Sequence, residues 1–307
     1  MTSTGKMASH NAPGNPLVSV IIPAYNGLEY IGAAIESVLA QNYRPLEVIV
    51  VDDGSPVPIA AALAGFGSEV RCVRQENAGT AAARNRGLRE SRGEFIALLD
   101  QDDLWLPGKL ERQIPRFAED PKIGLVAAWM EVFDALTGET KGTYEPPAEL
   151  DVHAILGFVL PPVQTIVFRR SALEKIGGFD ASLRGTDDWD VNIRMAAEFR
   201  VVSVGEILGR GRMHASQQGG NGEQMYRNGM KVMDKHRHLH PGCEQCRAAV
   251  RKSRGLLREH YYNYIRGRAR AAWHGRRYTD AATSALCAFW QYPPALKRVL
   301  SRALSSH

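Results

Sequence analysis

The chain has 307 residues, of which 44% are apolar, and a formal net charge of +5. This composition supports a sizeable folded core and excludes a wholly disordered chain. Four cysteines are too few for a disulfide framework, and the first thirty residues lack a signal-peptide pattern, so we expect a cytoplasmic setting. No apolar stretch approaches the roughly 20 residues that a membrane-spanning helix needs.

The charge is distributed unevenly along the chain. From Arg247 to the end there are 13 Lys and Arg residues against two acidic ones, Glu259 and Asp280. Aromatic side chains such as Tyr264 and Trp273 are interleaved with them. A segment of this kind suits an anionic membrane surface, and the alternative is an ordinary helical appendage with solvated arginines. Nothing in it favours binding to nucleic acid.

The first elements alternate between strand and helix. Residues 1–15 are rich in small and polar side chains and predict a flexible arm outside the fold. The apolar run Leu17–Ile22 predicts a buried strand that stops at Pro23, and apolar residues at helical spacing follow from Tyr30 to Leu39. Leu46–Val51 predicts a second strand.

The same alternation continues through the next fifty residues. A short strand is predicted at Val70–Val73, a helix rich in Ala and Arg after Thr80, and a strand at Phe95–Leu99. Alternation of this kind predicts an α/β fold with a mostly parallel, Rossmann-like sheet flanked by helices.

Each predicted strand is followed by a polar loop. Because ligands bind at the carboxyl ends of parallel strands, these loops together predict one binding crevice. The loops are Pro23–Asn26, Asp52–Ser55, Asn77–Gly79 and Asp100–Asp103.

The loop Asp100-Gln101-Asp102-Asp103 is the most informative of them. Carboxylates crowded at the end of a buried strand repel one another unless a cation or hydrogen-bond donors compensate. Oxygen ligands suit Mg²⁺ or Mn²⁺, which proteins hold with one or two carboxylates plus substrate phosphates. A solvated acidic turn is the alternative interpretation.

The elements that follow are less regular. A strand is predicted at Leu125–Phe133, a polar and mobile loop over Leu136–Asp151, and a strand at Gln164–Phe168. Ser171–Glu174 has the pattern of a capping box that opens a short helix, and Gly177-Gly178 predicts where that helix ends.

A second acidic cluster, Asp187-Asp188-Trp189-Asp190, precedes apolar residues at helical spacing. Carboxylates in the first turn of a helix are stabilised by the free N–H groups there. Helix capping is therefore one interpretation of Asp187 and Asp188.

In this order the motifs resemble the inverting glycosyltransferases of family 2, which have the GT-A fold. The resemblance covers about residues 16 to 215. It is carried by Val18–Asn26, Val50–Ser55, Asn77–Gly79, Ala83–Asn85, Leu99–Asp103, Gly177–Asp180 and Asp187–Asp190. It implies a GT-A domain over residues 16–222 and leaves residues 223–307 as a basic, mainly helical extension.

The resemblance also implies a nucleotide-diphosphate sugar as donor and assigns residues to it. Asp53 takes the position that accepts an N–H of the base, which suggests UDP and leaves dTDP and GDP open. Asp100 takes the ribose side of the family's D-x-D motif. The nucleotide-binding positions are Pro23, Ala24, Tyr25, Asp53, Asn77, Gly79, Arg84 and Asp100.

The resemblance places the metal, Mn²⁺ or Mg²⁺, on Asp102 and His214. Asp103 either supports Asp102 or caps the following helix. Asp188 takes the position of the catalytic base, and Asp187 stands where the family usually has a supporting glutamate.

In the implied reaction, Asp188 deprotonates an acceptor hydroxyl that attacks the anomeric carbon from the face opposite the nucleotide. The acceptor would be a glycan, a lipid-linked sugar or a protein in surface polysaccharide, glycolipid or glycoprotein synthesis, reached from the cytoplasm or the inner membrane face. The Gln-x-x-Arg-Trp motif of processive synthases is absent, which favours transfer of one sugar per encounter. A non-catalytic homologue that binds nucleotide sugars or glycans is the alternative.

Two further patterns lie outside the resemblance. His236, His238, His240, Cys243 and Cys246 form either a zinc site or a polar turn with reduced thiols. Helices are predicted at Gly255–Trp273 and Thr279–Trp290. A dinucleotide-dependent oxidoreductase is excluded, because no G-x-G-x-x-G follows the first strand.

Overall fold

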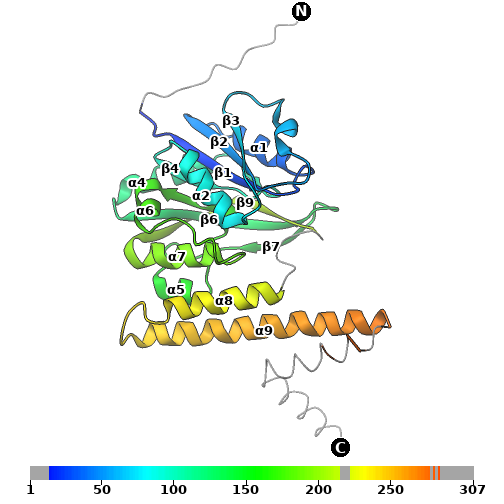
Figure 1. Cartoon of the computed structure of the whole chain (residues 1–307). Helices are drawn as coiled ribbons and strands as arrows, with labels where there is room; N and C mark the ends of the chain where they lie inside the picture. The colour runs from blue at the N-terminus through cyan, green and yellow to red at the C-terminus, as the bar shows by residue number, and fades with distance from the viewer. Residues whose placement is uncertain (1–13, 215–221, 277–278, 281–282, 284–307) are drawn as a thin grey trace, which may run out of the picture. The chain divides into compact units, whose positions relative to one another are not determined.

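The computed structural model describes residues 14–214, 222–276, 279–280 and 283. Its strands form one nine-stranded sheet in the order β3-β2-β1-β4-β8-β6-β9-β5, with β7 paired to β6 (Figure 1). The strands are β1 Val18–Ala24, β2 Leu46–Asp52, β3 Val70–Arg74, β4 Phe95–Leu98, β5 Leu104–Trp105, β6 Ile123–Asp134, β7 Thr140–Tyr144, β8 Val167–Arg169 and β9 Arg200–Met213.

Helices lie between most of these strands, so the predicted α/β class is confirmed. The α-helices are α1 Ile31–Leu39, α2 Thr80–Glu90, α3 Lys109–Gln113, α4 Arg116–Glu119, α5 Val152–Leu156, α6 Arg170–Lys175, α7 Asp187–Glu198, α8 Gly222–His236 and α9 Glu244–His274. Two short 3₁₀ turns add Ile59–Leu63 and Val163–Thr165.

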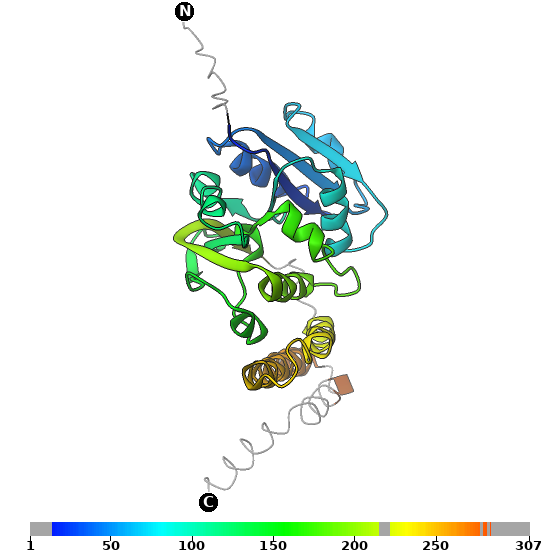
Figure 2. The same ribbon diagram turned by 90° about the vertical axis from the view of Figure 1, so that its left-hand side faces the viewer.

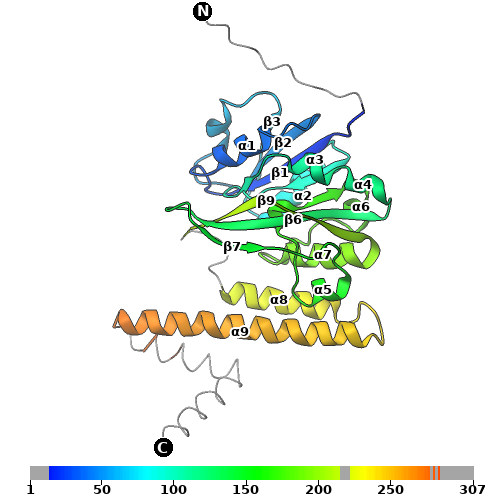
Figure 3. The same cartoon turned by 180° about the vertical axis from the view of Figure 1, so that it is seen from behind.

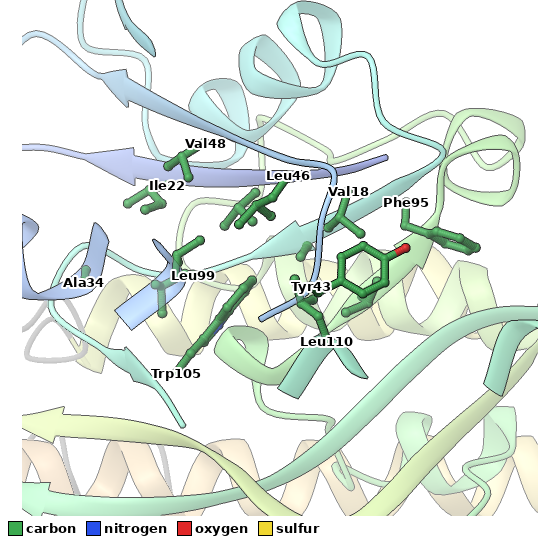
Figure 4. Close-up of a cluster of buried hydrophobic side chains, with 14 of the residues drawn as sticks. Val18, Ile22, Ala34, Tyr43, Leu46, Val48, Phe95, Leu99, Trp105 and Leu110 are labelled. Carbon is green, nitrogen blue, oxygen red and sulfur yellow. The ribbon is translucent and has the colours of Figure 1, made fainter. Parts of the chain in front are cut away.

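Strands β3, β2, β1 and β4 form the parallel part of the sheet, and β1 is buried on both faces. Val20 and Ile22 of β1 belong to the main apolar core together with Ile35 of α1. Figure 4 shows part of this cluster. Ile21 points to the other face, toward α2. In Figure 2 the blue α1 and the cyan α2 lie on opposite sides of these strands. Burial on both faces explains the continuous apolar run of β1.

Helix α2 approaches the sheet closely because Gly87 has no side chain. A Cβ at Gly87 would lie 2.4 Å from Cγ2 of Ile21, whereas a Cβ at Gly32 in α1 would meet nothing within 4 Å. We expect Gly87→Ala to lower the free energy of unfolding by about 1–2 kcal/mol, because overpacking exceeds the gain in helix propensity. Gly32→Ala should leave it unchanged or raise it by up to about 1 kcal/mol. Urea unfolding of both variants is the measurement; equal effects would contradict this packing.

The second half of the sheet is mixed. Strand β8 pairs antiparallel with both β4 and β6, while β6 and β9 pair parallel. The segment predicted as a polar loop over residues 136–151 instead contains β7, which pairs antiparallel with β6 (Figure 3). The polar side chains of this segment are compatible with a strand because β7 lies off the main path and residues 140–143 are exposed.

Three smaller predictions can be compared with the structure. Strand β1 continues through Pro23 to Ala24. Its pairing with β4 ends at Ile21, so the missing N–H of Pro23 removes no hydrogen bond from that pairing. The predicted capping box is wrong, since α6 begins at Arg170 and Arg169 makes no side-chain cap. Gly177 and Gly178 end this helix as predicted, with φ of 84° and 68° and N–H bonds to the carbonyls of Glu174 and Leu173.

The described residues divide into two compact units. The first holds residues 14–155, 159–182 and 187–214, and the second holds 156–158, 183–186 and those from 222 onward. In the second unit α8 and α9 pack beside each other (Figures 1 and 2). Helix α9 begins at Glu244, eleven residues before the predicted start at Gly255. The helix predicted at 279–290 lies almost wholly outside the described residues.

Candidate functional site

The site lies at the edge of the sheet where β1, β2 and β4 end. The loops after these strands contain Tyr25, Asp53 and Asp100, as the sequence predicted. Parallel pairing puts these three strand ends at the same edge. Pro23 and Ala24 are buried at the end of strand β1, whereas the Tyr25 side chain is 41% exposed.

Asp53 organises the loop that leads into α2. Its Oδ1 accepts hydrogen bonds from Nε2 of Gln75 at 2.7 Å and from the N–H of Ala78 at 2.9 Å. Its Oδ2 accepts the N–H of Gly79 at 2.8 Å. A carboxylate has about four lone-pair positions, so these three bonds leave a further one on Oδ2. The sequence did not reveal that Asp53 also builds the 75–79 loop.

Asp52, next to it, has a structural role. It is 1% exposed and accepts hydrogen bonds from the N–H groups of Ser55 and Ile59 and from Nη1 of Arg74. Burial works against its ionisation, but these donors outweigh burial and hold the pKa of Asp52 below its usual value. Asp52 is therefore an ionised anchor that fixes the conformation of the loop after β2.

Gln101 connects the loop after β4 to the loop after β1. Its Oε1 accepts the N–H of Tyr25 at 2.9 Å, and its Nε2 donates to the carbonyl of Tyr25 at 3.0 Å. A Cβ at Gly27 would lie 1.9 Å from Oε1 of Gln101, so only glycine leaves room for this pair of bonds. Sequence reasoning missed Gln101, because a side chain between two aspartates carries no signal for a bond 76 residues away.

Arg84 joins the two acidic clusters. Its Nη1 donates to Oδ2 of Asp187 at 2.7 Å, and its Nη2 donates to Oδ1 of Asp100 at 2.9 Å. Arg84 is 4% exposed. Burial disfavours its charge, but Asp187, Asp100 and Asp188 outweigh burial and hold the pKa of Arg84 above its usual value. The guanidinium therefore stays charged and brings the loop after β4 to the start of α7.

Asp188 occupies the first turn of α7 beside this ion pair. Its Oδ1 accepts the N–H of Trp189 at 2.8 Å. Burial, together with the charge of Asp187, raises the pKa of Asp188 to about 6, although the charge of Arg84 opposes both effects. A carboxylate in such surroundings is a stronger base than an exposed one and is still largely ionised at neutral pH. The bond to a free N–H in the first turn and the raised pKa are compatible, so stabilisation by the start of the helix and basicity are not exclusive alternatives.

Asp102 lies against the end of β9. Its Oδ2 is 2.8 Å from Nε2 of His214, and the two side chains are 20% and 11% exposed. The backbone of Asp102 is held by Nε of Arg212, which bonds its carbonyl at 2.8 Å. The structure thus brings together the two side chains that the sequence assigned to the metal, although 112 residues separate them.

Asp103 does not cap a helix. Its two carboxylate oxygens accept Nε2 of Gln164 at 2.8 Å and the N–H of Arg212 at 2.7 Å. Burial raises the pKa of Asp103 well above its usual value, and the charges of Asp100 and Asp102 add to this effect. The arrangement matches the supporting role that the sequence analysis kept open, because it ties the loop after β4 to β9.

The donor set of Asp102 and His214 fits a divalent cation. A carboxylate oxygen suits both Mn²⁺ and Mg²⁺, whereas the imidazole nitrogen at hydrogen-bond distance from it suits a transition metal such as Mn²⁺ better than Mg²⁺. Two protein ligands leave further positions for phosphate oxygens, as in other nucleotide sites. Burial raises the pKa of the neighbouring Asp100, the charge of Asp102 adds to this, and Arg84 opposes it, so a cation here would relieve like-charge repulsion.

The histidine and cysteine cluster of the second unit is less organised. Sγ of Cys246 lies 3.4 Å from Nδ1 of His240, and the N–H of Cys246 points to Sγ of Cys243 at 3.4 Å. These contacts suit both a zinc site and a polar turn with thiols, so the zinc hypothesis stays a prediction. Within the described ranges, no helix is long and apolar enough to cross a bilayer.

Comparison with known proteins agrees with this geometry. The fold and the site define a GT-A type of glycosyltransferase scaffold. Residues 19–177 match the sequence model of the family described as Glycosyl transferase family 2, which spans just over half of the chain. The chain belongs to glycosyl transferase family 2, so the predicted family and fold are confirmed.

Curated relatives share about a third of their residues with the chain over the matched region. An uncharacterized glycosyltransferase of Rickettsia prowazekii is 33% identical over 217 residues, which cover 66% of this chain and 66% of the relative. The glucosyltransferase WfaP of Escherichia coli, named for UDP-Glc and a GlcNAc-diphosphoundecaprenol acceptor, is 31% identical over 52% of this chain and 63% of its own length. The chain thus spans about two thirds of these relatives.

Solved structures share the fold at low identity. TarS of S. aureus superposes with a TM-score of 0.61 and 18% identity, covering 81% of this chain and 73% of TarS. The mannosyltransferase PcManGT of Pyrobaculum calidifontis, solved with GDP-Man and Mn²⁺, gives a TM-score of 0.62 at 19% identity, covering 95% of this chain and 81% of its own.

Proposed function

We propose that this protein is an inverting, metal-dependent glycosyltransferase that moves one sugar from a nucleotide-diphosphate sugar to an acceptor hydroxyl. The observation that carries the proposal is the pair of acidic groups joined by Arg84. One guanidinium bonds both Asp100, two residues before the metal candidate Asp102, and Asp187, next to the base candidate Asp188. The groups proposed to bind the donor and to deprotonate the acceptor would therefore lie close together.

In this proposal Asp188 takes the proton of the acceptor hydroxyl as the new C–O bond forms. Attack comes from the face opposite the nucleotide, the bond from the anomeric carbon to the diphosphate breaks, and the nucleoside diphosphate leaves with the electron pair. Asp102 and His214 would hold Mn²⁺ or Mg²⁺, which would supply positive charge for the leaving diphosphate. Asp187 keeps Arg84 in position, although it is shorter than the glutamate usual in the family.

Relatives and neighbours support parts of this proposal. TarS has been solved with UDP and with UDP-GlcNAc, PcManGT with GDP-Man, and WfaP is named as a UDP-Glc enzyme. We favour a UDP-sugar donor and an acceptor in polysaccharide, glycolipid or glycoprotein synthesis. Tyr25, Asp53, Asn77 and Gly79 would line the base.

A direct test uses a panel of UDP-, dTDP- and GDP-sugars, with donor hydrolysis measured in the presence and absence of Mn²⁺ or Mg²⁺. We expect one donor to be hydrolysed only with metal. Asp102→Ala should weaken UDP binding in the presence of Mn²⁺ at least about tenfold, because it removes a metal ligand. The same variant should change UDP binding little in EDTA. Tight nucleotide binding without hydrolysis of any donor would favour the alternative, a non-catalytic nucleotide-sugar or glycan-binding homologue.

We also propose that the protein associates peripherally with an anionic membrane at the inner face of the cell membrane. Arg266, Arg268 and Arg270 of α9 are exposed, and Trp273 is 62% exposed. Each basic residue near an anionic surface contributes about 1 kcal/mol. Replacing the three arginines by Gln should weaken flotation with anionic vesicles about 10- to 100-fold and leave the weaker binding to neutral vesicles unchanged. Equal flotation of both proteins would remove α9 from the membrane proposal.

A further inference from the structure

Tyr30 connects the start of α1 to the residues around the end of β9. It directly precedes α1, and it is partly buried. The centroid of its ring lies 5.0 Å from that of His214, with 43° between the two ring planes. The guanidinium carbon of Arg212 lies over the same tyrosine ring, 4.7 Å from its centroid. Tyr30 therefore contacts both the candidate metal ligand after β9 and the arginine two residues before it.

Arg212 fixes the loop after β4 through its backbone and its side chain. Its Nε donates to the carbonyl of Asp102 at 2.8 Å, and its N–H donates to Oδ1 of Asp103 at 2.7 Å. The guanidinium carbon also lies 4.8 Å from the ring centroid of Phe133, which is 5% exposed. Each cation–π contact of this kind contributes about 0.5–2 kcal/mol. The two rings therefore restrict the guanidinium to the position from which Nε reaches the carbonyl.

The spacing of the two candidate metal ligands is close to what an octahedral cation requires. Neighbouring ligand atoms at about 2.1 Å from such a cation are about 3 Å apart. Oδ2 of Asp102 and Nε2 of His214 are 2.8 Å apart. The groups of a binding site must be held to within about 0.5 Å of their working positions. Contacts that fix these two ligands therefore bear directly on metal affinity.

We propose that Tyr30 and Arg212 are positioning residues for the cation site. Tyr30 fixes the imidazole of His214. Arg212 fixes the backbone of Asp102 and supports the ring of Tyr30. The inference rests on the metal-dependent transfer proposed above and assigns two further residues to it. Neither residue needs to touch the cation, because groups that orient metal ligands change metal affinity about 10- to 100-fold when they are removed.

The test measures how much Mn²⁺ strengthens UDP binding, by calorimetric titration of the full chain with Mn²⁺ and in EDTA. Tyr30→Leu removes the ring, and Arg212→Met removes the guanidinium. Each substitution should weaken UDP binding about tenfold with Mn²⁺ and less than about twofold in EDTA. Tyr30→Phe keeps the ring, so its UDP affinity should stay within about twofold of that of the unmodified protein in both conditions.

Arg210→Met is the matched control on the same strand. The guanidinium carbon of Arg210 also lies over the ring of Phe133, 4.3 Å from its centroid, and its Nη2 pairs with Glu131 of β6 at 3.1 Å. The substitution thus removes an arginine from the same ring but keeps the bond of Arg212 to the loop. The effect of Mn²⁺ on UDP binding should change less than about twofold. Thermal unfolding of each variant is measured alongside.

Three outcomes would overturn the positioning role. The first is an undiminished effect of Mn²⁺ in both Tyr30→Leu and Arg212→Met. The second is an equal loss of UDP binding with Mn²⁺ and in EDTA, which would assign the two residues to the fold. The third is a loss in Arg210→Met as large as that in Arg212→Met.

Asp102→Ala distinguishes these outcomes from a failure of the proposed function. It removes a ligand, so it should abolish the effect of Mn²⁺ whether or not the positioning role holds. If Asp102→Ala leaves the effect of Mn²⁺ unchanged, or if Mn²⁺ has no effect on UDP binding by the unmodified protein, the metal site itself fails, and the positioning role fails with it.

Discussion

Replacing Asp188 by Asn is expected to lower the rate of sugar transfer about 10²- to 10⁴-fold, the usual contribution of a general base. The substitution keeps the size of the side chain, and its oxygen can still accept the N–H of Trp189. UDP affinity with Mn²⁺ should stay within about threefold of the original, since Asp188 does not belong to the donor set. Turnover with saturating acceptor and calorimetric UDP binding separate the two effects.

Glu119→Gln is the matched control, because it also neutralises a carboxylate but on the exposed surface of α4, where Glu119 pairs with Arg116. It should leave turnover unchanged. Near-normal turnover of Asp188→Asn would remove Asp188 from the catalytic role.

The pH profile gives a second view of the same residue. The base acts when ionised, and the pKa of Asp188 is raised to about 6. Transfer by the unmodified protein should therefore rise about tenfold per pH unit below 6 and level off above about 7. Residual transfer by Asp188→Asn should lack this rise. A profile that is flat from pH 5 to 8 in the unmodified protein would contradict a base with a raised pKa.

The parallel half of the fold was predictable because its strands are buried on both faces. Continuous apolar runs such as Leu17–Ile22 and Leu46–Val51 are typical of strands covered by helices on each side, and the polar loops after them mark the strand ends. Strand β9 was not predicted, because three glycines and several charged residues interrupt its apolar residues. Strands β7 and β5 were not predicted either. Residues 140–144 are mostly exposed and β5 has two residues, so neither has an apolar pattern to recognise.

The position of the site was predictable for the same reason, but its internal bonding was not. Parallel strands bring Asp53 and Asp100 to one edge whatever their side chains do. The contact of Arg84 with Asp187 joins residues 103 positions apart, and that of Gln101 with Tyr25 joins residues 76 apart. Such pairs depend on tertiary packing, and no local pattern in one sequence records them.

Arg84→Met is expected to lower the free energy of unfolding by about 3–5 kcal/mol, because it leaves the buried carboxylate of Asp187 without its counter-charge. Asp187 is 2% exposed, and Asp100 also loses its partner. Arg86→Met on the same helix is the control. Arg86 pairs with Glu90 at 2.9 Å, but the two side chains are 35% and 30% exposed, so its loss should cost less than about 0.5 kcal/mol. Urea unfolding of both variants measures the difference; similar losses would contradict the buried ion pair.

A double substitution identifies the origin of that loss. If the loss comes from the uncompensated charge of Asp187, then Asp187→Asn should recover part of it in the Arg84→Met background, because asparagine carries no charge to bury. The sum of the losses of unfolding free energy in the two single variants should exceed the loss in the double variant by about 1–3 kcal/mol. Additive losses would instead assign the effect to packing of the arginine stem. The charge of Arg84 also lowers the pKa of Asp188. In Arg84→Met this pKa should be higher, so the rise in the pH profile of the remaining activity should shift to a higher pH.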